Sequence, residues 1–88
     1  MSLPRTSDLE AFLAVARLGS FRLAARERGV TGSALSQTIR ALEEELQVRL
    51  FNRTTRSVVL TEAGSLLASR LSPALAELRA SLEEVRSL

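Results

Sequence analysis

The sequence contains no Cys, His, Lys, Trp or Tyr. Without Cys and His, the chain has no disulfides, thiol nucleophiles or imidazole bases, and it lacks the usual protein ligands of zinc and haem. Its ten acidic residues mostly follow helical spacing, and they do not form the carboxylate pair that acid–base catalysis uses. These absences argue against an enzyme, a metal site and a bound cofactor.

Long apolar segments are also missing. The N-terminal stretch "MSLPRTSDLE" has no apolar core of signal-peptide length, and no run in the chain approaches a membrane span. We therefore expect a soluble, cytoplasmic protein. The 88 residues make one small domain, near the size at which a single core supplies only a few kcal/mol of stability. Surface buried against a partner would add to that stability.

The basic residues are all Arg, and they are sorted along the chain. The net charge is only +2, with twelve Arg against ten acids. Four Arg and one acid lie in residues 20–40, three Glu and no base in residues 41–48, and three Arg and no acid in residues 49–56. Two basic patches therefore flank an acidic one. Such runs are either solvated helix faces or an electrostatic footprint for phosphate, and charge alone does not separate the two.

Apolar spacing and capping residues predict two short helices in the first third of the chain. In "SDLE", Ser7 and Glu10 have the spacing of a capping box, so the first helix is expected to begin at Ser7 and to end at Gly19. Ser20 is the predicted N-cap of a second helix, "FRLAARER", which Gly29 ends. The side chains of the second helix that we expect in the core are Phe21, Leu23, Ala24 and Ala25.

The stretch "GVTGSALSQTIRALEEEL" predicts a third, amphipathic helix with Thr31 as its N-cap. Its apolar stripe consists of Leu35, Ile39, Leu42 and Leu46. Projection at about 100° per residue places on the opposite side Ser33, Gln37, Arg40 and Glu44. The residues on its flanks are Ser36 and Thr38.

A tight turn at Gly29 joins the second and third helices, which is the arrangement of a helix-turn-helix over about residues 20–46. Ser, Thr and Gln in the first two turns of the third helix can reach base edges in a major groove, and the positive end of the helix dipole favours nearby phosphate. Glu43, Glu44 and Glu45 would be repelled by DNA, so we expect them to point away from it. An ordinary amphipathic core helix is the alternative.

After Leu46, β-prone runs replace the helical pattern. In "QVRLFNRTTRSVVLT", residues 48–51 and 58–60 are separated by a polar loop, which predicts a two-stranded hairpin over about residues 48–60. Beside a helix-turn-helix, such a hairpin is a wing. Arg53 and Arg56 are expected at its tip, where a guanidinium can reach backbone phosphate or a narrow minor groove. The alternative is a solvated turn.

Thr61 is the predicted N-cap of a long fourth helix. Its apolar residues alternate spacings of four and three, which indicates the seam of a coiled coil and a candidate for self-association. The residues of this seam are Leu71, Leu75, Leu78, Leu82 and Val85. We expect Pro73 to kink or break the helix, because it cannot donate to the Ser69 carbonyl. A long helix packed on its own domain is the alternative.

The segment "SFRLAARERGVTGSALSQTIRALEEELQVRLFNRTTRSVVLTEAG" closely resembles the N-terminal DNA-binding domain of LysR-type transcriptional regulators. The similarity runs from about Asp8 through the helix after Thr61, and "LFNRT" and "LTEAG" are its most specific parts. It implies a mainly α, winged helix-turn-helix fold with three helices and a two-stranded wing over residues 1–60, followed by a linker and dimerisation helix over residues 61–88. It also implies a homodimer on an interrupted inverted repeat of double-stranded DNA.

Full-length members of that family usually carry a C-terminal domain that binds a small-molecule effector. Nothing of that domain is present in this sequence, so an effector is expected only if a parent protein contains it. The chain resembles a DNA-binding domain cut just before the effector domain, and a natural short protein is the alternative.

The resemblance also implies which residues face DNA. On the third helix these are Thr31, Ser33, Ser36, Gln37, Thr38 and Arg40. On the wing they are Arg53, Thr54 and Arg56. The chain has Gln37 where many members have Arg, and Gly32-Ser33 where many have Gln-Pro, so its base preference should differ, since Gln suits adenine and Arg suits guanine. Gln47 stands where a helix-ending Gly is common, which predicts a strained stop or one without a left-handed residue.

The sequence therefore favours a sequence-specific DNA-binding transcription regulator over two other classes. A protein-interaction domain would use the same helices without touching DNA, and the salt dependence of binding would distinguish it. RNA binding is disfavoured, because the chain has three Phe and no Trp or Tyr for base stacking.

Overall fold

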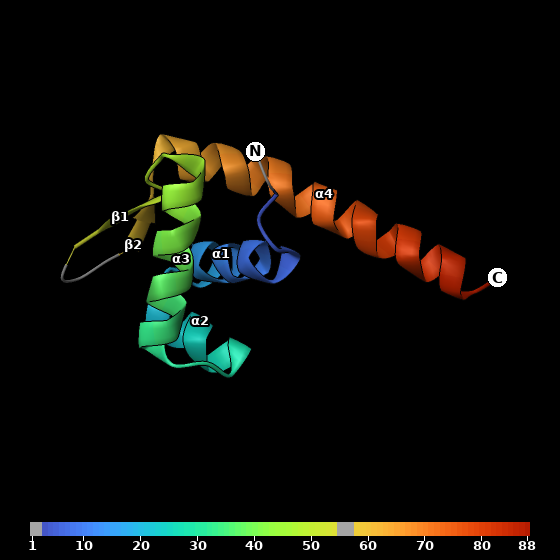
Figure 1. Cartoon of the computed structure of the whole chain (residues 1–88), viewed down its shortest axis with the longest axis horizontal. Helices are drawn as coiled ribbons and strands as arrows, with labels where there is room; N and C mark the ends of the chain where they lie inside the picture. The colour runs from blue at the N-terminus through green and yellow to red at the C-terminus, as the bar shows by residue number, and fades with distance from the viewer. Residues whose placement is uncertain (1–2, 55–57) are drawn as a thin grey trace.

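The computed structural model describes residues 3–54 and 58–88, and it is mainly helical. Four helices and one two-stranded sheet follow in the order α1 (Thr6–Leu18), α2 (Phe21–Arg28), α3 (Gly32–Leu46), β1 (Phe51–Arg53), β2 (Val58–Leu60) and α4 (Glu62–Arg86). The first three helices form a body, the hairpin extends from one side of it, and α4 crosses the body and projects away (Figure 1). The predicted winged helix-turn-helix fold with a long C-terminal helix is confirmed.

Local capping decides most helix ends, as the sequence predicts. The side chains of Ser20, Thr31 and Thr61 accept backbone N–H groups at the starts of α2, α3 and α4. Gly19 and Gly29 end α1 and α2 with φ angles of 64° and 69°, in the left-handed region that glycine enters without a steric cost.

The predicted start of α1 is wrong. The helix begins at Thr6 with Arg5 as its N-cap, and no side chain caps it. The Arg5 carbonyl accepts the N–H groups of Asp8 and Leu9 at 3.0 and 3.1 Å, so the first turn closes on Arg5, two residues before the predicted N-cap Ser7. The Arg5 guanidinium lies 3.7 Å from the Asp8 carboxylate at this end of the helix.

Gln47 ends α3 in the strained way that the sequence allowed. It is the only residue other than glycine with a positive φ among residues 3–54 and 58–88, at 60°. A left-handed conformation costs a non-glycine residue about 1–2 kcal/mol. The Gln47 Nε2 donates to the Glu44 carbonyl at 2.6 Å, and this hydrogen bond to the end of the helix offsets part of the strain.

The core lies where α1, α2 and α3 meet. The largest of its fully buried side chains are those of Phe12, Phe51, Leu35, Ile39, Leu50 and Val15. On α3 the predicted stripe is buried at Leu35, Ile39 and Leu42 and partly buried at Leu46. The prediction that Leu23 lies in the core is wrong, since this residue is 37% exposed. The helix α2 turns its small residues Ala24 and Ala25 toward the body, and Leu23 falls on the other side.

The wing is shorter than predicted, and it begins later. Strands β1 and β2 pair antiparallel, with Phe51 opposite Leu60 and Arg53 opposite Val58. Val48 was expected in the first strand but is exposed and precedes it, because the chain is still leaving the turn at Gln47. Asn52 belongs to β1 and not to the loop.

The helix α4 runs without interruption across Pro73, so the predicted break is absent. The missing proline N–H therefore removes one hydrogen bond without ending the helix. Although α4 has 25 residues, no helix of the described part of the chain is long and apolar enough to cross a membrane.

The predicted apolar seam of α4 is divided between two environments. Leu71 packs against the core cluster, and Leu75 is only 5% exposed within the single chain. Arg79 adds an ion pair to Glu10 of α1 at 3.0 Å. Part of the alternative, a helix packed on its own domain, is therefore correct for the first half of α4.

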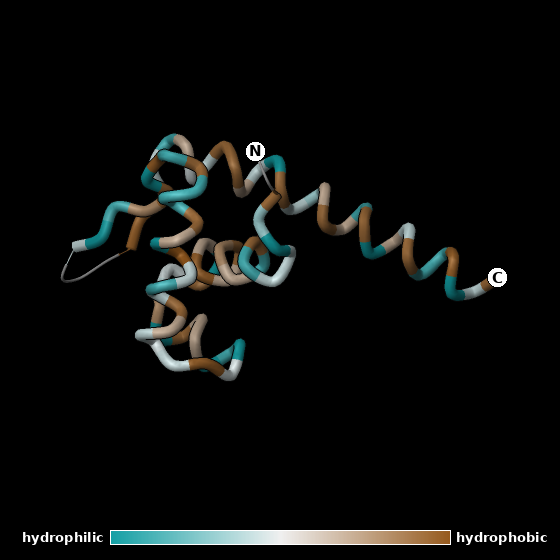
Figure 2. Tube along the Cα trace, in the orientation of Figure 1, coloured by the Kyte–Doolittle hydropathy of each residue, from teal (hydrophilic) through white to brown (hydrophobic). Residues whose placement is uncertain are grey.

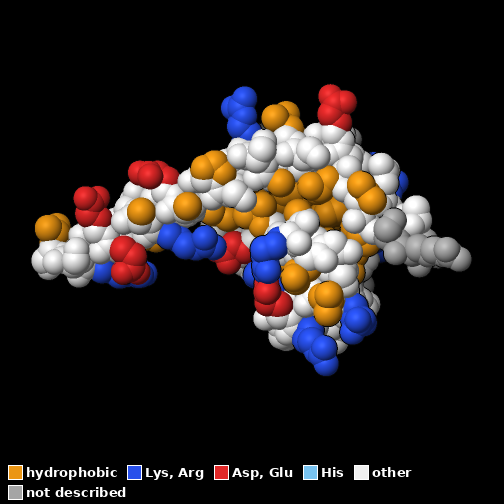
Figure 3. Space-filling model, turned by 180° about the vertical axis from the view of Figure 1, so that it is seen from behind, with side chains coloured by type: hydrophobic (Ala, Val, Ile, Leu, Met, Phe, Trp, Pro, Cys, Tyr) orange, Lys and Arg blue, Asp and Glu red, His pale blue; other side chains and the backbone are white. Residues whose placement is uncertain are grey.

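The second half of α4 projects from the body with its apolar residues uncovered. Leu78, Leu82 and Val85 are 45%, 48% and 66% exposed. Hydrophobic positions recur along this projecting part (Figure 2), and from behind they stand as separate spots between charged side chains, whereas under the first half of α4 they gather into a continuous patch (Figure 3).

Gly64 brings the first turn of α4 into contact with the wing. A Cβ atom at this position would lie 2.1 Å from the Leu50 carbonyl oxygen and 2.9 Å from a methyl carbon of Leu60. The backbone contact at this point includes a hydrogen bond from the Thr61 N–H to the same Leu50 carbonyl, at 3.0 Å. The glycine of "LTEAG" is thus required by close approach and not by its φ angle.

We expect Gly64→Ala to lower the free energy of unfolding by about 1–3 kcal/mol, because the methyl group forces the wing and α4 apart. Urea denaturation monitored by circular dichroism measures this. Gly32→Ala is the matched control, since a Cβ there meets nothing within 4 Å, and the change should stabilise by about 0.4–1 kcal/mol. Equal effects of the two substitutions would contradict this account.

Candidate nucleic-acid interface

The turn between α2 and α3 is short and held by backbone hydrogen bonds. The N–H of Gly29 bonds to the Arg26 carbonyl, and that of Val30 to the Ala25 carbonyl at 3.0 Å. Thr31 then caps α3 by accepting the Ala34 N–H, also at 3.0 Å. The N-terminus of α3 is therefore fixed relative to α2, and its first residues are exposed.

One face of α3 is polar and open to solvent, as predicted. Ser33, Gln37 and Arg40 are exposed along about two turns of the helix, and no acid interrupts them. Ser36 and Thr38, on the flanks of this face, are half-buried. Thr38 donates its hydroxyl to the Ala34 carbonyl at 3.1 Å, so its proton is already committed to the helix backbone.

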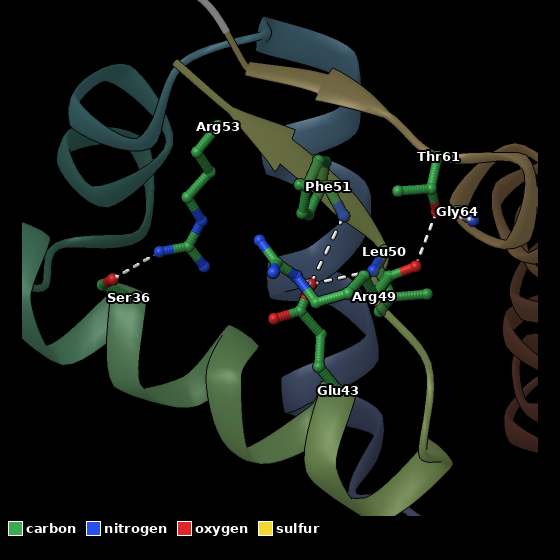
Figure 4. Close-up of polar contacts among 8 residues, drawn as sticks. All are labelled: Ser36, Glu43, Arg49, Leu50, Phe51, Arg53, Thr61 and Gly64. Carbon is green, nitrogen blue, oxygen red and sulfur yellow. Dashed lines mark hydrogen bonds and ion pairs between the residues drawn. The ribbon is translucent and has the colours of Figure 1, made fainter. Parts of the chain in front are cut away.

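The three adjacent acids at the end of α3 differ in their exposure to solvent. Glu44 and Glu45 are exposed, whereas the Glu43 side chain is only 10% exposed. Its carboxylate accepts the N–H groups of Leu50 and Phe51 at 2.8 and 3.3 Å (Figure 4). The Glu43 carboxylate therefore holds the chain entering β1, a role that the sequence did not predict, and the expectation that it points away from DNA stays a prediction.

The spacing of Glu43 was a signal that sequence reasoning missed. Glu43 lies seven residues after Ser36, so the two side chains share one flank of α3. That flank faces the wing, since Ser36 contacts Arg53 there. The charge pattern alone could not show this, because Glu43, Glu44 and Glu45 are adjacent and identical in type.

Arg53 is not at the tip of the wing. It is the last residue of β1, and its guanidinium carbon lies 4.3 Å from the centroid of the Phe21 ring. Its Nη1 donates to the Ser36 Oγ at 3.1 Å (Figure 4). The exposed Thr54 follows β1, and Arg56 lies outside the described residues. The structure thus brings together two predicted site residues that the sequence placed on separate elements.

The three Phe side chains connect this contact to the core. The Phe21 and Phe51 ring centroids are 5.9 Å apart in an edge-to-face arrangement, and the Phe12 and Phe51 centroids are 5.4 Å apart. Aromatic pairs at such distances add about 0.5–1.5 kcal/mol to the effect of burial. Arg53 therefore stacks on a ring that is itself fixed.

An open groove of about 570 Å³ lies between the second half of α3 and the wing. Three Arg and two Glu side chains line it, together with Gln47 and Val48. The Arg49 Nε is 4.0 Å from the Glu43 carboxylate at this groove. Its mixed charge distinguishes it from the exposed first turns of α3 at Ser33 and Gln37, where no acid lies. In the described residues, no three His, Cys, Asp or Glu side chains are grouped so that they could hold a metal ion.

Comparison with known proteins gives one family. Residues 6–65 match the model of bacterial regulatory helix-turn-helix proteins of the lysR family. Over 79 residues the chain is 56% identical to the uncharacterized HTH-type transcriptional regulator YcaN of Escherichia coli strain K12, which covers 90% of this chain and 26% of that protein. The chain spans about a quarter of the length of the curated relatives it matches.

Solved structures of protein–DNA complexes have the same fold. The crystal structure titled BenM_DBD/catB site 1 DNA complex matches with a TM-score of 0.91 at 27% identity, covering 96% of this chain and 93% of that chain. Full-length CbnR complexed with its target DNA matches with a TM-score of 0.87 at 28% identity, covering 96% of this chain and 29% of that chain.

The contact between Glu43 and the wing predicts a difference between neighbouring acids. Glu43→Ala leaves two partly buried N–H groups without their acceptor, so the free energy of unfolding should fall by about 1–3 kcal/mol. Glu44→Ala is the control, because this side chain is exposed and its loss should change stability by no more than about 0.5 kcal/mol. Chemical denaturation of both variants measures the difference. The assignment is wrong if Glu44→Ala is as destabilising as Glu43→Ala.

Proposed function

The chain belongs to the lysR family of bacterial regulatory helix-turn-helix proteins and is a DNA-binding domain of that family, and from this premise we propose that it binds an operator as a dimer. In the proposed complex α3 lies in the major groove, and the wing lies on the backbone or in the minor groove. The site is an interrupted inverted repeat, with one domain on each half.

The exposed face of α3 is the single observation that carries this proposal. Ser33, Gln37 and Arg40 present hydroxyl, amide and guanidinium groups on a helix whose entry turn is rigid. These groups hydrogen-bond to base edges in a major groove. The N-terminus of α3 adds the positive end of a helix dipole, which attracts phosphate. Glu44 comes about one turn after Arg40, so the repulsive charge is kept away from the first turns of α3.

The proposed DNA contacts fall into two groups. On α3 they are Thr31, Ser33, Ser36, Gln37, Thr38 and Arg40. On the wing they are Arg53, Thr54 and Arg56. We assign base reading mainly to the exposed residues of α3 and phosphate contact mainly to the wing, because phosphate contacts set position and base contacts set preference.

The projecting half of α4 supports the proposed dimer. Leu78, Leu82 and Val85 are apolar and exposed on one stripe of a helix that no part of the described chain covers there. Pairing two such helices would bury these side chains, at about 25 cal/mol for each Å² of apolar surface. Leu71 and Leu75 belong to the same stripe, and in the single chain they pack on the body.

Regulation of transcription by a longer parent protein is part of the same proposal. The relatives are named as transcriptional regulators and not as enzymes. They are about three and a half times as long as this chain, so a parent protein has room for a domain that binds a small-molecule effector. We propose that such a domain would control the binding that this chain performs.

The function is tested by titrating the chain and its Gln37→Ala variant against duplexes at several salt concentrations. The duplexes are a site selected from random sequence and its single-position variants. For the wild type, the logarithm of affinity should fall by about 0.9 per phosphate neutralised for each tenfold rise in salt. Gln37→Ala should lose about 1–3 kcal/mol of preference at one base pair of each half-site, because Gln makes a bidentate pair with adenine.

Folding should survive this change, since Gln37 is exposed and such substitutions shift stability by within about 0.5 kcal/mol. A wild-type chain that does not bind duplex DNA would overturn the proposed function and favour a protein-interaction domain, and one that binds every duplex equally would overturn sequence-specific binding. A variant with the wild-type preference at every position would remove Gln37 from the readers and leave Ser33, Ser36 and Arg40 as the better candidates.

The projecting stripe of α4 should set the oligomeric state. Replacing both Leu78 and Leu82 by Lys places charge in the proposed dimer interface, at a cost of several kcal/mol per buried ion, so sedimentation velocity should show a monomer. Ala76→Lys with Ala80→Lys is the matched control, because it adds the same charge on the opposite side of the exposed helix. A dimer that survives Leu78→Lys with Leu82→Lys would place the interface elsewhere.

A further inference from the structure

One guanidinium joins the wing to both helices of the helix-turn-helix. The Arg53 side chain extends from β1, lies 4.3 Å from the Phe21 ring centroid at the start of α2, and donates to Ser36 on α3 at 3.1 Å (Figure 4). Both Arg53 and Ser36 are half-buried. A planar guanidinium that stacks and donates at once has little freedom of orientation, unlike an exposed arginine.

The ring under Arg53 is itself held in place. Phe21 contacts Phe51 edge to face, with their centroids 5.9 Å apart, and Phe51 is fully buried. The stack therefore runs from the core through Phe51 and Phe21 to the Arg53 guanidinium. The N–H group that meets Ser36 is fixed by this stack and not by Ser36 alone.

The chemistry of a hydroxyl explains what this contact does to Ser36. A serine oxygen has one hydrogen to donate and two lone pairs that accept. At Ser36 one lone pair accepts an N–H from a cation, which polarises the O–H bond and strengthens donation. The second lone pair lies next to a positive charge and is a poorer acceptor. Ser36 is thereby prepared to donate its hydrogen.

We propose that Arg53 is a positioning residue that prepares Ser36 to donate a hydrogen bond to one base pair in the major groove. This inference rests on the proposed function, because it requires α3 to lie in that groove. The acceptors available there are purine N7, guanine O6 and thymine O4, whereas the amino groups of adenine and cytosine are donors. Arg53 is then the exception among the wing contacts: it acts on sequence preference through Ser36, whereas phosphate contact falls mainly to Thr54 and Arg56.

The test compares Arg53→Lys, Ser36→Ala and the double variant with the wild type, using the 88-residue chain, a selected duplex and its single-position variants. Lysine keeps the charge of Arg53 but has no planar group to stack on Phe21. Arg49→Lys is the matched control, because Arg49 is also close to the wing, is exposed, and contacts Glu43 only at 4.0 Å. Thermal denaturation of each variant identifies losses that come from unfolding.

We expect Arg53→Lys and Ser36→Ala to lose about five- to tenfold of preference at the same base pair of each half-site. The double variant should lose no more than Ser36→Ala alone, because the two residues form one contact. The salt slope of Arg53→Lys should equal that of the wild type, since the charge is kept. Arg49→Lys should keep the wild-type preference at every position.

Base analogues at the affected pair identify the direction of the hydrogen bond. Replacing a purine by its 7-deaza analogue removes N7, whereas replacing a thymine by 4-thiothymine or a guanine by 6-thioguanine weakens the O4 or the O6 acceptor. One of these changes should reproduce the loss for the wild type and have no effect on Ser36→Ala. If removal of an amino group gives the loss instead, Ser36 accepts and the inference is wrong.

Two further results would overturn the inference while leaving the proposed function intact. The first is equal weakening of all duplexes by Arg53→Lys or Ser36→Ala, which would make these residues phosphate contacts. The second is losses at different base pairs that add in the double variant, which would make them independent readers. Absence of site preference in the wild type would instead overturn the proposed function, so the two failures are distinguishable.

Discussion

The burial of the Phe51 ring is the contact on which the position of the wing depends. A strand of three residues is not stable alone, and β1 is held because its first side chain lies between Phe12 and Phe21. The same residue gives its N–H to Glu43, and the preceding Leu50 carbonyl accepts from Thr61. Two consecutive residues thus join the wing to all four helices. The base of the hairpin is therefore part of the hydrophobic core, and the rest of the hairpin extends from it.

The features that the sequence predicts well are those that a few neighbouring residues decide. Thr31 and Thr61 each cap a helix through an N–H group three residues along the chain, and this contact needs nothing from the rest of the molecule. The buried stripe of α3 is equally local, because its 3.6-residue period fixes one face wherever the helix lies. These two kinds of signal were enough to predict the helix-turn-helix and its exposed polar face.

The features that the sequence does not predict depend on contacts between distant segments. Glu43 bonds to the chain seven and eight residues later, Arg53 stacks on a ring 32 positions before it, and Leu75 is buried on a body formed by the first three helices. Each of these side chains has a plausible role in isolation, as a repelled acid, a tip cation or a seam leucine. Only the folded arrangement shows which role is available, because burial removes a side chain from solvent and from any partner that it was expected to meet.

The attachment of α4 to α1 has a consequence for how two domains would measure DNA. Leu75 and the ion pair between Arg79 and Glu10 fix the direction in which the helix leaves the body, and the same body carries α3. In a dimer joined through the far end of α4, the length of this helix and its angle to the body would set the distance between the two copies of α3. The spacing between half-sites that such a dimer accepts would then depend on Leu75, Arg79 and Glu10, which lie outside the proposed DNA contacts.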